Sequence, residues 1–180
     1  IVGKYISMKD AYISLIEALN HGGIYNDINV DIKWISAETL ENDKDIENYF
    51  KDINGLIIPG GFGERGIEGK IEAIKYAREN KIPYLGICLG MQLMCVEFAR
   101  NILDYKEANT IEVNENAKYP IITLMEEQKK NILKGGTMRL GAFPCEIKEE
   151  SLAYKLYKNK IISERHRHRY EFNNEYINDM

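Results

Sequence analysis

The 180-residue chain has few cysteines, few histidines and no excess of positive charge. Its three cysteines, Cys88, Cys95 and Cys145, are an odd number without a Cys-x-x-Cys pair, which argues against a disulfide framework and against a zinc site. Thiols of this kind suit a reducing compartment, so we expect a cytoplasmic protein. The formal net charge of -4 gives no reason to expect a nucleic-acid partner, apart from the local basic segment at residues 165–169.

Long hydrophobic runs are also absent. The most apolar region, residues 82–99, is interrupted by Pro83, by polar positions and by Glu97, so it does not meet the requirement for a membrane span. Nothing at the N-terminus resembles a signal peptide.

The length suits one domain over residues 1–180. Because a strand pattern starts at Ile1 and a helix pattern starts just before Met180, we interpret the chain as a piece of a longer polypeptide, truncated at its C-terminal side.

Strand and helix patterns alternate over the first hundred residues. The predicted strands cover residues 1–5, 28–35, 56–58 and 82–87. The first predicted helix begins at a capping Asp10 and ends at Gly22-Gly23. Further helices are predicted over residues 45–53, 68–80 and 91–100. Such alternation with short apolar strands predicts an α/β fold, with a mostly parallel central sheet flanked by helices on both faces.

The second half of the chain has a different pattern. Residues 137–147 and 161–172 read as longer, more exposed strands, and residues 151–157 suit a short helix. Residues 121–134 are polar and give no clear assignment.

The segment Gly86-Ile87-Cys88-Leu89-Gly90 lies between a predicted strand and a predicted helix. Small residues two positions before and after a side chain at such a turn let the turn close, as in the serine nucleophile elbow. The first N–H groups and the positive dipole end of the helix would favour the thiolate. A lone cysteine is more often a small core residue, but this position favours Cys88 as a nucleophile. Neither Cys95 nor Cys145 has an activating context.

A second glycine turn, Pro59-Gly60-Gly61, closes the preceding predicted strand. Ligands of parallel α/β sheets bind beyond the C-terminal strand ends, where this turn and Cys88 both lie. The backbone N–H groups of Gly60 and Gly61 are therefore candidates to stabilise an oxyanion, although an isolated Pro-Gly-Gly is usually an ordinary turn.

A cysteine nucleophile normally needs a histidine base. His21 is placed at a helix C-terminus, where a cation is favourable, so we interpret it as structural. His166 and His168 alternate with arginines on one predicted strand face. One of them is a candidate base, but the catalytic triad is incomplete.

Four blocks together resemble the glutaminase domains of the CTP synthase family, a branch of the class I glutamine amidotransferases. They are Pro-Gly-Gly-Phe-Gly-Glu-Arg-Gly at 59–66, Gly-Ile-Cys-Leu-Gly-Met-Gln at 86–92, Gly-Gly-Thr-Met-Arg-Leu-Gly at 135–141, and Glu-Arg-His-Arg-His-Arg-Tyr-Glu-Phe-Asn at 164–173. The resemblance implies a flavodoxin-like fold and hydrolysis of L-glutamine to glutamate and ammonia.

The same resemblance implies roles for individual residues. Cys88 would form a glutamyl thioester, and the N–H groups of Gly61 and Leu89 would form the oxyanion hole. Gly61 and Leu89 would also contact the substrate, together with Gln92, Glu112 and Arg169. Charge supports the last two, because an amino acid offers an ammonium to Glu112 and a carboxylate to Arg169.

The resemblance extends to regulation and partners. Phe62, Gly63 and Arg65 correspond to a lid near which GTP acts as an allosteric activator. The domain itself would need no cofactor and no metal. The ammonia would pass to a synthase domain of the same polypeptide, not included in this sequence, which uses ATP and Mg²⁺ to aminate UTP to CTP in a homotetramer.

One departure from the family pattern bears on activity. The family carries its catalytic histidine and glutamate in a downstream His-Pro-Glu motif, which does not occur in this sequence. As a fragment the chain is therefore expected to lack its base. Two alternatives stay open: a glutamine- or GTP-binding regulatory module without turnover, and another class I amidotransferase or a γ-glutamyl hydrolase.

Overall fold

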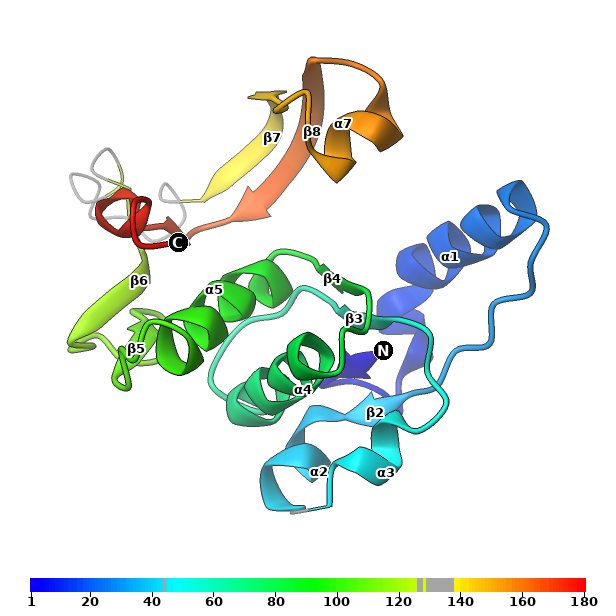
Figure 1. Ribbon diagram of the computed structural model, residues 1–180, viewed down its shortest axis with the longest axis horizontal. Helices are drawn as coiled ribbons and strands as arrows, with labels where there is room; N and C mark the ends of the chain where they lie inside the picture. The colour runs from blue at the N-terminus through cyan, green and yellow to red at the C-terminus, as the bar shows by residue number, and fades with distance from the viewer. Residues whose placement is uncertain (44, 126–127, 129–137) are drawn as a thin grey trace.

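The fold was obtained as a computed structural model, which describes residues 1–43, 45–125, 128 and 138–180 (Figure 1). The predicted strand start at Thr137 and the glycines of the 135–141 block, Gly135 and Gly136, lie outside the described residues.

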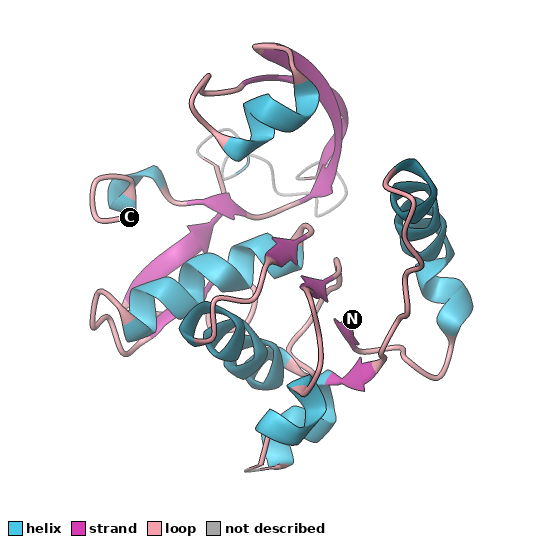
Figure 2. Ribbon diagram, turned by 45° about the vertical axis from the view of Figure 1, so that its right-hand side comes forward, coloured by secondary structure: helices cyan, strands magenta, loops and turns pink. Residues whose placement is uncertain are grey.

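The N-terminal two thirds form an α/β unit. Its elements, in chain order, are β1 (Val2–Gly3), η1 (Lys9–Tyr12), α1 (Ile13–Tyr25), β2 (Ile35–Ser36), α2 (Ala37–Asn42), α3 (Glu47–Phe50), β3 (Leu56–Ile58), α4 (Ile67–Glu79), β4 (Tyr84–Gly86), α5 (Leu89–Asn101), β5 (Ala108–Thr110) and β6 (Tyr119–Thr123). The pairs β1–β2, β3–β4 and β5–β6 are all parallel. Figure 2 shows α4 and α5 on one side of β3 and β4, with α1 on the other. The predicted α/β class is confirmed.

The core lies where α4 and α5 pack against the short strands. Ile58 of β3, Leu93 of α5 and Ile121 of β6 are fully buried at its centre. The two helices are also joined by an ion pair, in which Arg78 of α4 donates to the buried carboxylate of Glu97 at 2.9–3.1 Å. A buried charge needs such partners, so this pair fixes how α5 lies against α4.

The C-terminal part is a hairpin that returns to the α/β unit. Strands β7 (Arg139–Glu146) and β8 (Ile161–His168) are antiparallel, and α7 (Leu152–Tyr157) lies between them in the sequence. Strand β9 (Glu171–Phe172) then pairs antiparallel with β6, and η3 (Asn174–Tyr176) follows. The chain after β8 is thereby held beside α5.

Several predicted boundaries are wrong. Of the strand predicted over residues 28–35, only Ile35 lies in a strand, β2, and residues 28–33 instead line a groove together with Leu56 and Leu85. The strand predicted over residues 161–172 divides into β8 and β9, which belong to different sheets.

The first helix also differs from its prediction. Asp10 does not cap it: Asp10 lies in η1, and α1 starts at Ile13 without a side-chain cap. The helix continues through Gly22-Gly23 to Tyr25, where Asn26 N–H bonds to both glycine carbonyls. His21 therefore lies within the helix. In contrast, Ser151 caps α7 by accepting from Tyr154 N–H, close to the predicted helix start.

Candidate active site around Cys88

Cys88 occupies a sharp turn between β4 and α5, with φ of 54° and ψ of −107°. A Cβ added at Gly86 would lie 2.6 Å from the carbonyl carbon of Gly90, and one added at Gly90 would overlap the carbonyl oxygen of Ile58. The expected need for small residues on both sides of Cys88 is confirmed, because backbone fills the space that a larger side chain would take.

Strand pairing brings the second glycine turn to the same place. Ile87 N–H donates to the carbonyl of Ile58 at 3.0 Å, which extends the β3–β4 ladder to the start of both turns. A Cβ added at Gly60 would lie 3.4 Å from that of Cys88. The N–H groups of Gly61 and Leu89 both donate toward Sγ and lower the thiol pKa. The predicted oxyanion-hole donors thus face one sulfur.

The resting state of Cys88 differs from expectation. Burial raises the pKa of its thiol, the charge of Glu112 raises it further, and the two N–H groups offset these effects only in part. The sulfur lies 3.9 Å from the carbonyl oxygen of Arg167, which can accept from a thiol but not stabilise a thiolate. The N–H groups favour the thiolate as expected, but burial and the charge of Glu112 outweigh them in the unliganded chain.

Glu112 follows β5, and its Oε1 accepts from the N–H of Gly63 at 3.0 Å. The carbonyl of Phe62, in the same loop, accepts from Lys4 Nζ at 2.5 Å. Arg65 is engaged away from Cys88, in an ion pair with Glu38 at 3.0 Å and over the ring of Tyr5. Of the three predicted lid residues, Gly63 contacts a predicted substrate residue, while Phe62 is exposed and Arg65 pairs with α2.

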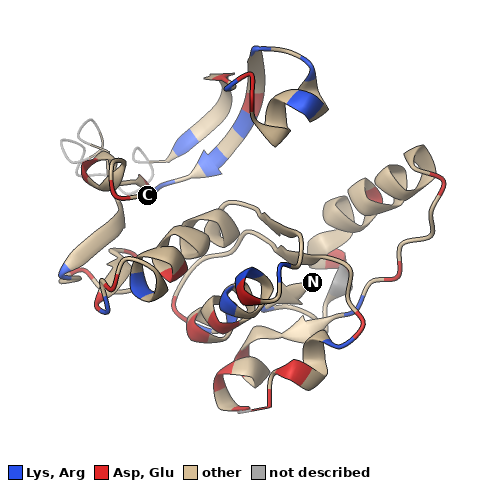
Figure 3. Ribbon diagram, in the orientation of Figure 1, with Lys and Arg blue, Asp and Glu red and all other residues tan. Residues whose placement is uncertain are grey.

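Gln92 lies where the hairpin returns to α5, and it contacts the segment that carries Arg169. Gln92 is almost fully buried, and its Nε2 donates to the carbonyl of Tyr170 at 2.8 Å. The carbonyl of Arg169 accepts from Gln128 Nε2 at 2.8 Å. The end of the hairpin near α5 carries several basic residues (Figure 3), which suits a carboxylate ligand.

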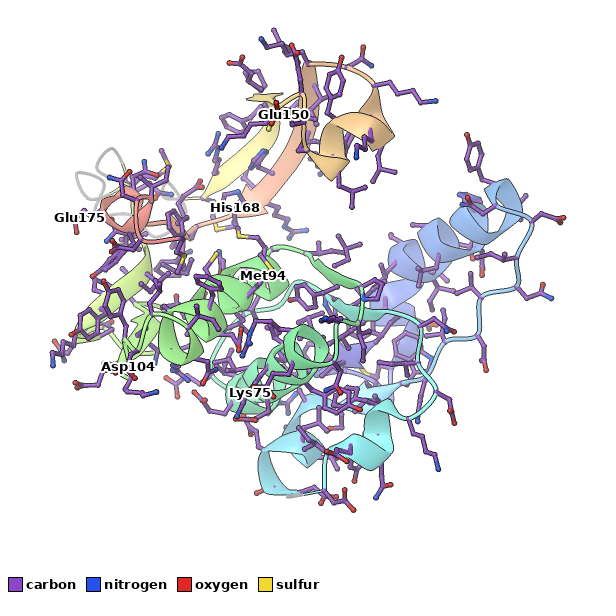
Figure 4. All side chains as sticks on the ribbon, in the orientation of Figure 1. Lys75, Met94, Asp104, Glu150, His168 and Glu175 are labelled. Atoms are coloured by element: carbon purple, nitrogen blue, oxygen red, sulfur yellow. The ribbon has the colours of Figure 1, made fainter. Side chains whose placement is uncertain are left out.

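The two candidate histidines bond to each other. His166 Nδ1 and His168 Nε2 lie 2.8 Å apart, and His168 Nδ1 is 3.2 Å from the carbonyl of Tyr170 and 3.4 Å from a carboxylate oxygen of Glu171. Figure 4 places His168 at the hairpin end nearest α5. Both of its ring nitrogens are thereby engaged, and the described contacts give neither imidazole a bond to Sγ. These bonds give the pair a structural role in the turn from β8 to β9.

Sequence reasoning without the family resemblance would have missed Glu112, since in Thr-Ile-Glu-Val at 110–113 it reads as a surface residue of a strand. The described residues contain no group of three histidine, cysteine or acidic side chains that could hold a metal ion. Among the residues that the structure describes, no helix is long and apolar enough to cross a membrane.

Known proteins share both the sequence and the fold. The CTP synthases of Clostridium beijerinckii and Methanocaldococcus jannaschii are 58% and 56% identical to this chain over 176 and 181 residues. Each match covers 98% of this chain, which spans about a third of the length of these curated relatives. A solved structure, the glutaminase domain of Trypanosoma brucei CTPS with bound acivicin, superposes with a TM-score of 0.91 at 36% identity, covering 99% of this chain and 69% of that one. The family model described as glutamine amidotransferase class-I matches residues 7–180, and the chain belongs to this family.

Proposed function

We propose that this chain is the glutaminase domain of a CTP synthase, which in the complete polypeptide hydrolyses L-glutamine through a thioester on Cys88. The observation that carries the proposal is the pair of N–H groups, from Gly61 and Leu89, that face the Cys88 sulfur from two separate turns. Donors in this arrangement suit the tetrahedral intermediate of acyl transfer. The relatives named as CTP synthases support the same assignment.

In the proposed reaction, a general base takes the proton of Cys88 and holds it for the leaving nitrogen, while Sγ attacks the side-chain carbonyl of glutamine. The carbonyl oxygen gains negative charge and accepts from Gly61 and Leu89. The carbon–nitrogen bond then breaks, the nitrogen takes a proton and leaves as ammonia, and a glutamyl thioester remains. Water attacks this thioester, which releases glutamate and restores Cys88.

The two ends of the substrate would be recognised by charge. The α-ammonium of glutamine pairs with Glu112 and the α-carboxylate with Arg169, while Gln92 fixes the segment that carries Arg169 through its bond to Tyr170. Because both charged partners are needed, the site should reject an analogue that lacks the ammonium.

The remainder of the proposal concerns the longer protein. Ammonia passes to a synthase domain that binds ATP and Mg²⁺ and aminates UTP, within a cytoplasmic homotetramer. GTP acts at the loop that contains Phe62, Gly63 and Arg65. The relatives support this context because they are about three times as long as this chain.

The raised pKa of Cys88 favours one alternative, a module that binds glutamine without turning it over. The two functions differ in a direct experiment on the complete polypeptide. We expect Cys88→Ala to abolish CTP formation from glutamine while sparing CTP formation from added ammonia. Glutamine binding by the unmodified protein without ammonia release would support the binding module, and loss of both activities in Cys88→Ala would contradict the assigned role of Cys88.

Covalent labelling tests the site itself. An electrophilic glutamine analogue should modify Cys88 alone, and excess glutamine should suppress the reaction. Equal labelling of Cys95 and Cys145, read by peptide mapping, would contradict a glutamine site at Cys88.

A further inference from the structure

We propose that Glu112 is a positioning residue for the oxyanion hole: by accepting the N–H of Gly63, it holds the loop after β3 so that the N–H of Gly61 stays directed at Cys88. This inference rests on the proposed function only in taking Cys88 as the reacting atom. It gives Glu112 a role before any substrate binds.

The bond joins distant parts of the chain at a glycine whose positive φ other residues rarely adopt. Gly63 has φ of 75° and lies two residues after Gly61. Glu112 approaches from the segment after β5, where its own N–H donates to the hydroxyl of the fully buried Thr110 at 3.2 Å. The backbone of Glu112 is therefore tied to a buried residue. From this fixed position its carboxylate can hold the loop after β3.

One peptide unit of the loop is held from both sides. Its carbonyl, that of Phe62, accepts from the ammonium of Lys4, and its N–H, that of Gly63, donates to the carboxylate of Glu112. A positive charge at the oxygen and a negative charge at the N–H both favour the same direction of the peptide dipole. Rotation of this unit would break two charge-assisted bonds at once, which restrains the loop two residues after Gly61 and limits the directions that the Gly61 N–H can take.

Recognition of the substrate ammonium leaves this bond intact. The bond to Gly63 uses Oε1 of Glu112, and the carboxylate has a second oxygen for the ammonium. One side chain thereby serves both the binding of the substrate's charged end and the geometry of the oxyanion hole.

The alternative is that Glu112 affects Cys88 only through its charge, which raises the thiol pKa. Glu112→Gln and Glu112→Ala separate the two roles. Both variants lose the charge, but only glutamine keeps a side-chain oxygen that accepts from Gly63 N–H. The exposed Glu107, which precedes β5 and pairs with Lys118, provides the matched control Glu107→Ala.

The measurement is the rate of Cys88 alkylation by iodoacetamide against pH, read by peptide mapping because Cys95 and Cys145 also react. We expect Glu112→Gln to react at pH 7 faster than the unmodified protein, since a repulsive charge is gone. Glu112→Ala should react about tenfold more slowly than Glu112→Gln, because it also loses the Gly61 N–H that stabilises the thiolate. Glu107→Ala should be unchanged. Equal rates for Glu112→Gln and Glu112→Ala would overturn the proposal.

Lys4→Met provides a second test if Glu112→Ala does not fold, as judged by its thermal unfolding. It removes the other anchor of the same peptide unit and should also slow alkylation of Cys88, and an unchanged rate would count against the proposal. Protection of Cys88 by excess glutamine is measured separately, in the unmodified protein. Absence of protection would contradict the proposed function, while the difference between the two Glu112 variants still decides the positioning role.

Discussion

At the scale of single residues, backbone crowding determines where the Cys88 sulfur lies, and burial determines its resting ionisation. Two N–H groups lower the thiol pKa, but removal from water and the charge of Glu112 outweigh them. For the proposed reaction, Cys88 therefore starts as a thiol and needs a base when the substrate arrives, and the N–H groups of Gly61 and Leu89 remain available for the developing oxyanion.

Gly90 provides a test of this crowding. Gly90→Ala forces a Cβ into the carbonyl of Ile58 and should lower the free energy of unfolding by about 2–3 kcal/mol, because neither backbone can move away without disturbing the β3–β4 pair. The matched control is Gly22→Ala in α1, where the added Cβ meets nothing within 4 Å. The control should instead stabilise the protein by about 0.5–1 kcal/mol. Urea unfolding measures both changes, and equal effects at the two glycines would contradict the steric account.

At the scale of elements, α4 buries a charged side chain, Lys70, and this burial lowers the free energy of unfolding. Lys70 is 2% exposed, and burial, together with the charge of Lys4, lowers the pKa of its ammonium to about 8. The folded state disfavours the protonated form relative to the unfolded state, whose lysine has a pKa of 10.5. This cost is fully present below pH 8 and decreases as the pH rises from 8 toward 10.5.

Lys70→Met should therefore stabilise the protein at pH 7. A shift from 10.5 to about 8 corresponds to about 3 kcal/mol, and the advantage of the variant should shrink as the pH rises from 8 to 10. Lys75→Met on the same helix is the control, since Lys75 is 38% exposed and makes only a long contact of 4.0 Å with Glu72. Chemical unfolding at several pH values measures the difference. A pH-independent gain would mean that the ammonium of Lys70 is not the source of the cost.

At the scale of the whole molecule, the candidate site joins two parts that are far apart in the sequence. The α/β unit provides Cys88, its N–H donors and Glu112, and the chain after the hairpin provides Arg169. The bond from Gln92 to Tyr170 connects them across 78 positions. Correct placement of Arg169 therefore depends on how the hairpin returns to α5.

Gln92→Met removes this bond at similar volume. Hydrogen exchange should become faster over residues 166–172, while β3 and β4 keep their protection, because the core beneath α5 is unchanged. The KM for glutamine should rise about tenfold in the complete enzyme, as expected for the loss of about 1.4 kcal/mol from one bond. Met94→Leu, at a partly exposed position of α5, is the control. Faster exchange throughout the α/β unit would indicate general loosening instead.

The elements with strong local patterns were largely predicted from the sequence. Helices α4, α5 and α7 start and end within about two residues of their predicted bounds, and strand β3 matches its prediction. The strands β5 and β6 were not predicted, since Thr110 and Ile121 lie in short segments whose burial depends on α5 packing over them. Residues 28–33 show the opposite error: their alternation predicts a strand, but in the structure they line a groove outside any strand.

The sequence by itself determined the α/β alternation, the elbow at Cys88 and the glycine turn at Gly61, because steric exclusion and side-chain periodicity act within a few residues. Only the tertiary structure decided that Gly63 and Glu112, 49 positions apart, share a hydrogen bond, and that the pKa of Cys88 is raised. Both depend on which groups the fold brings together and how much water it excludes. Neither can be predicted from a short segment of the sequence.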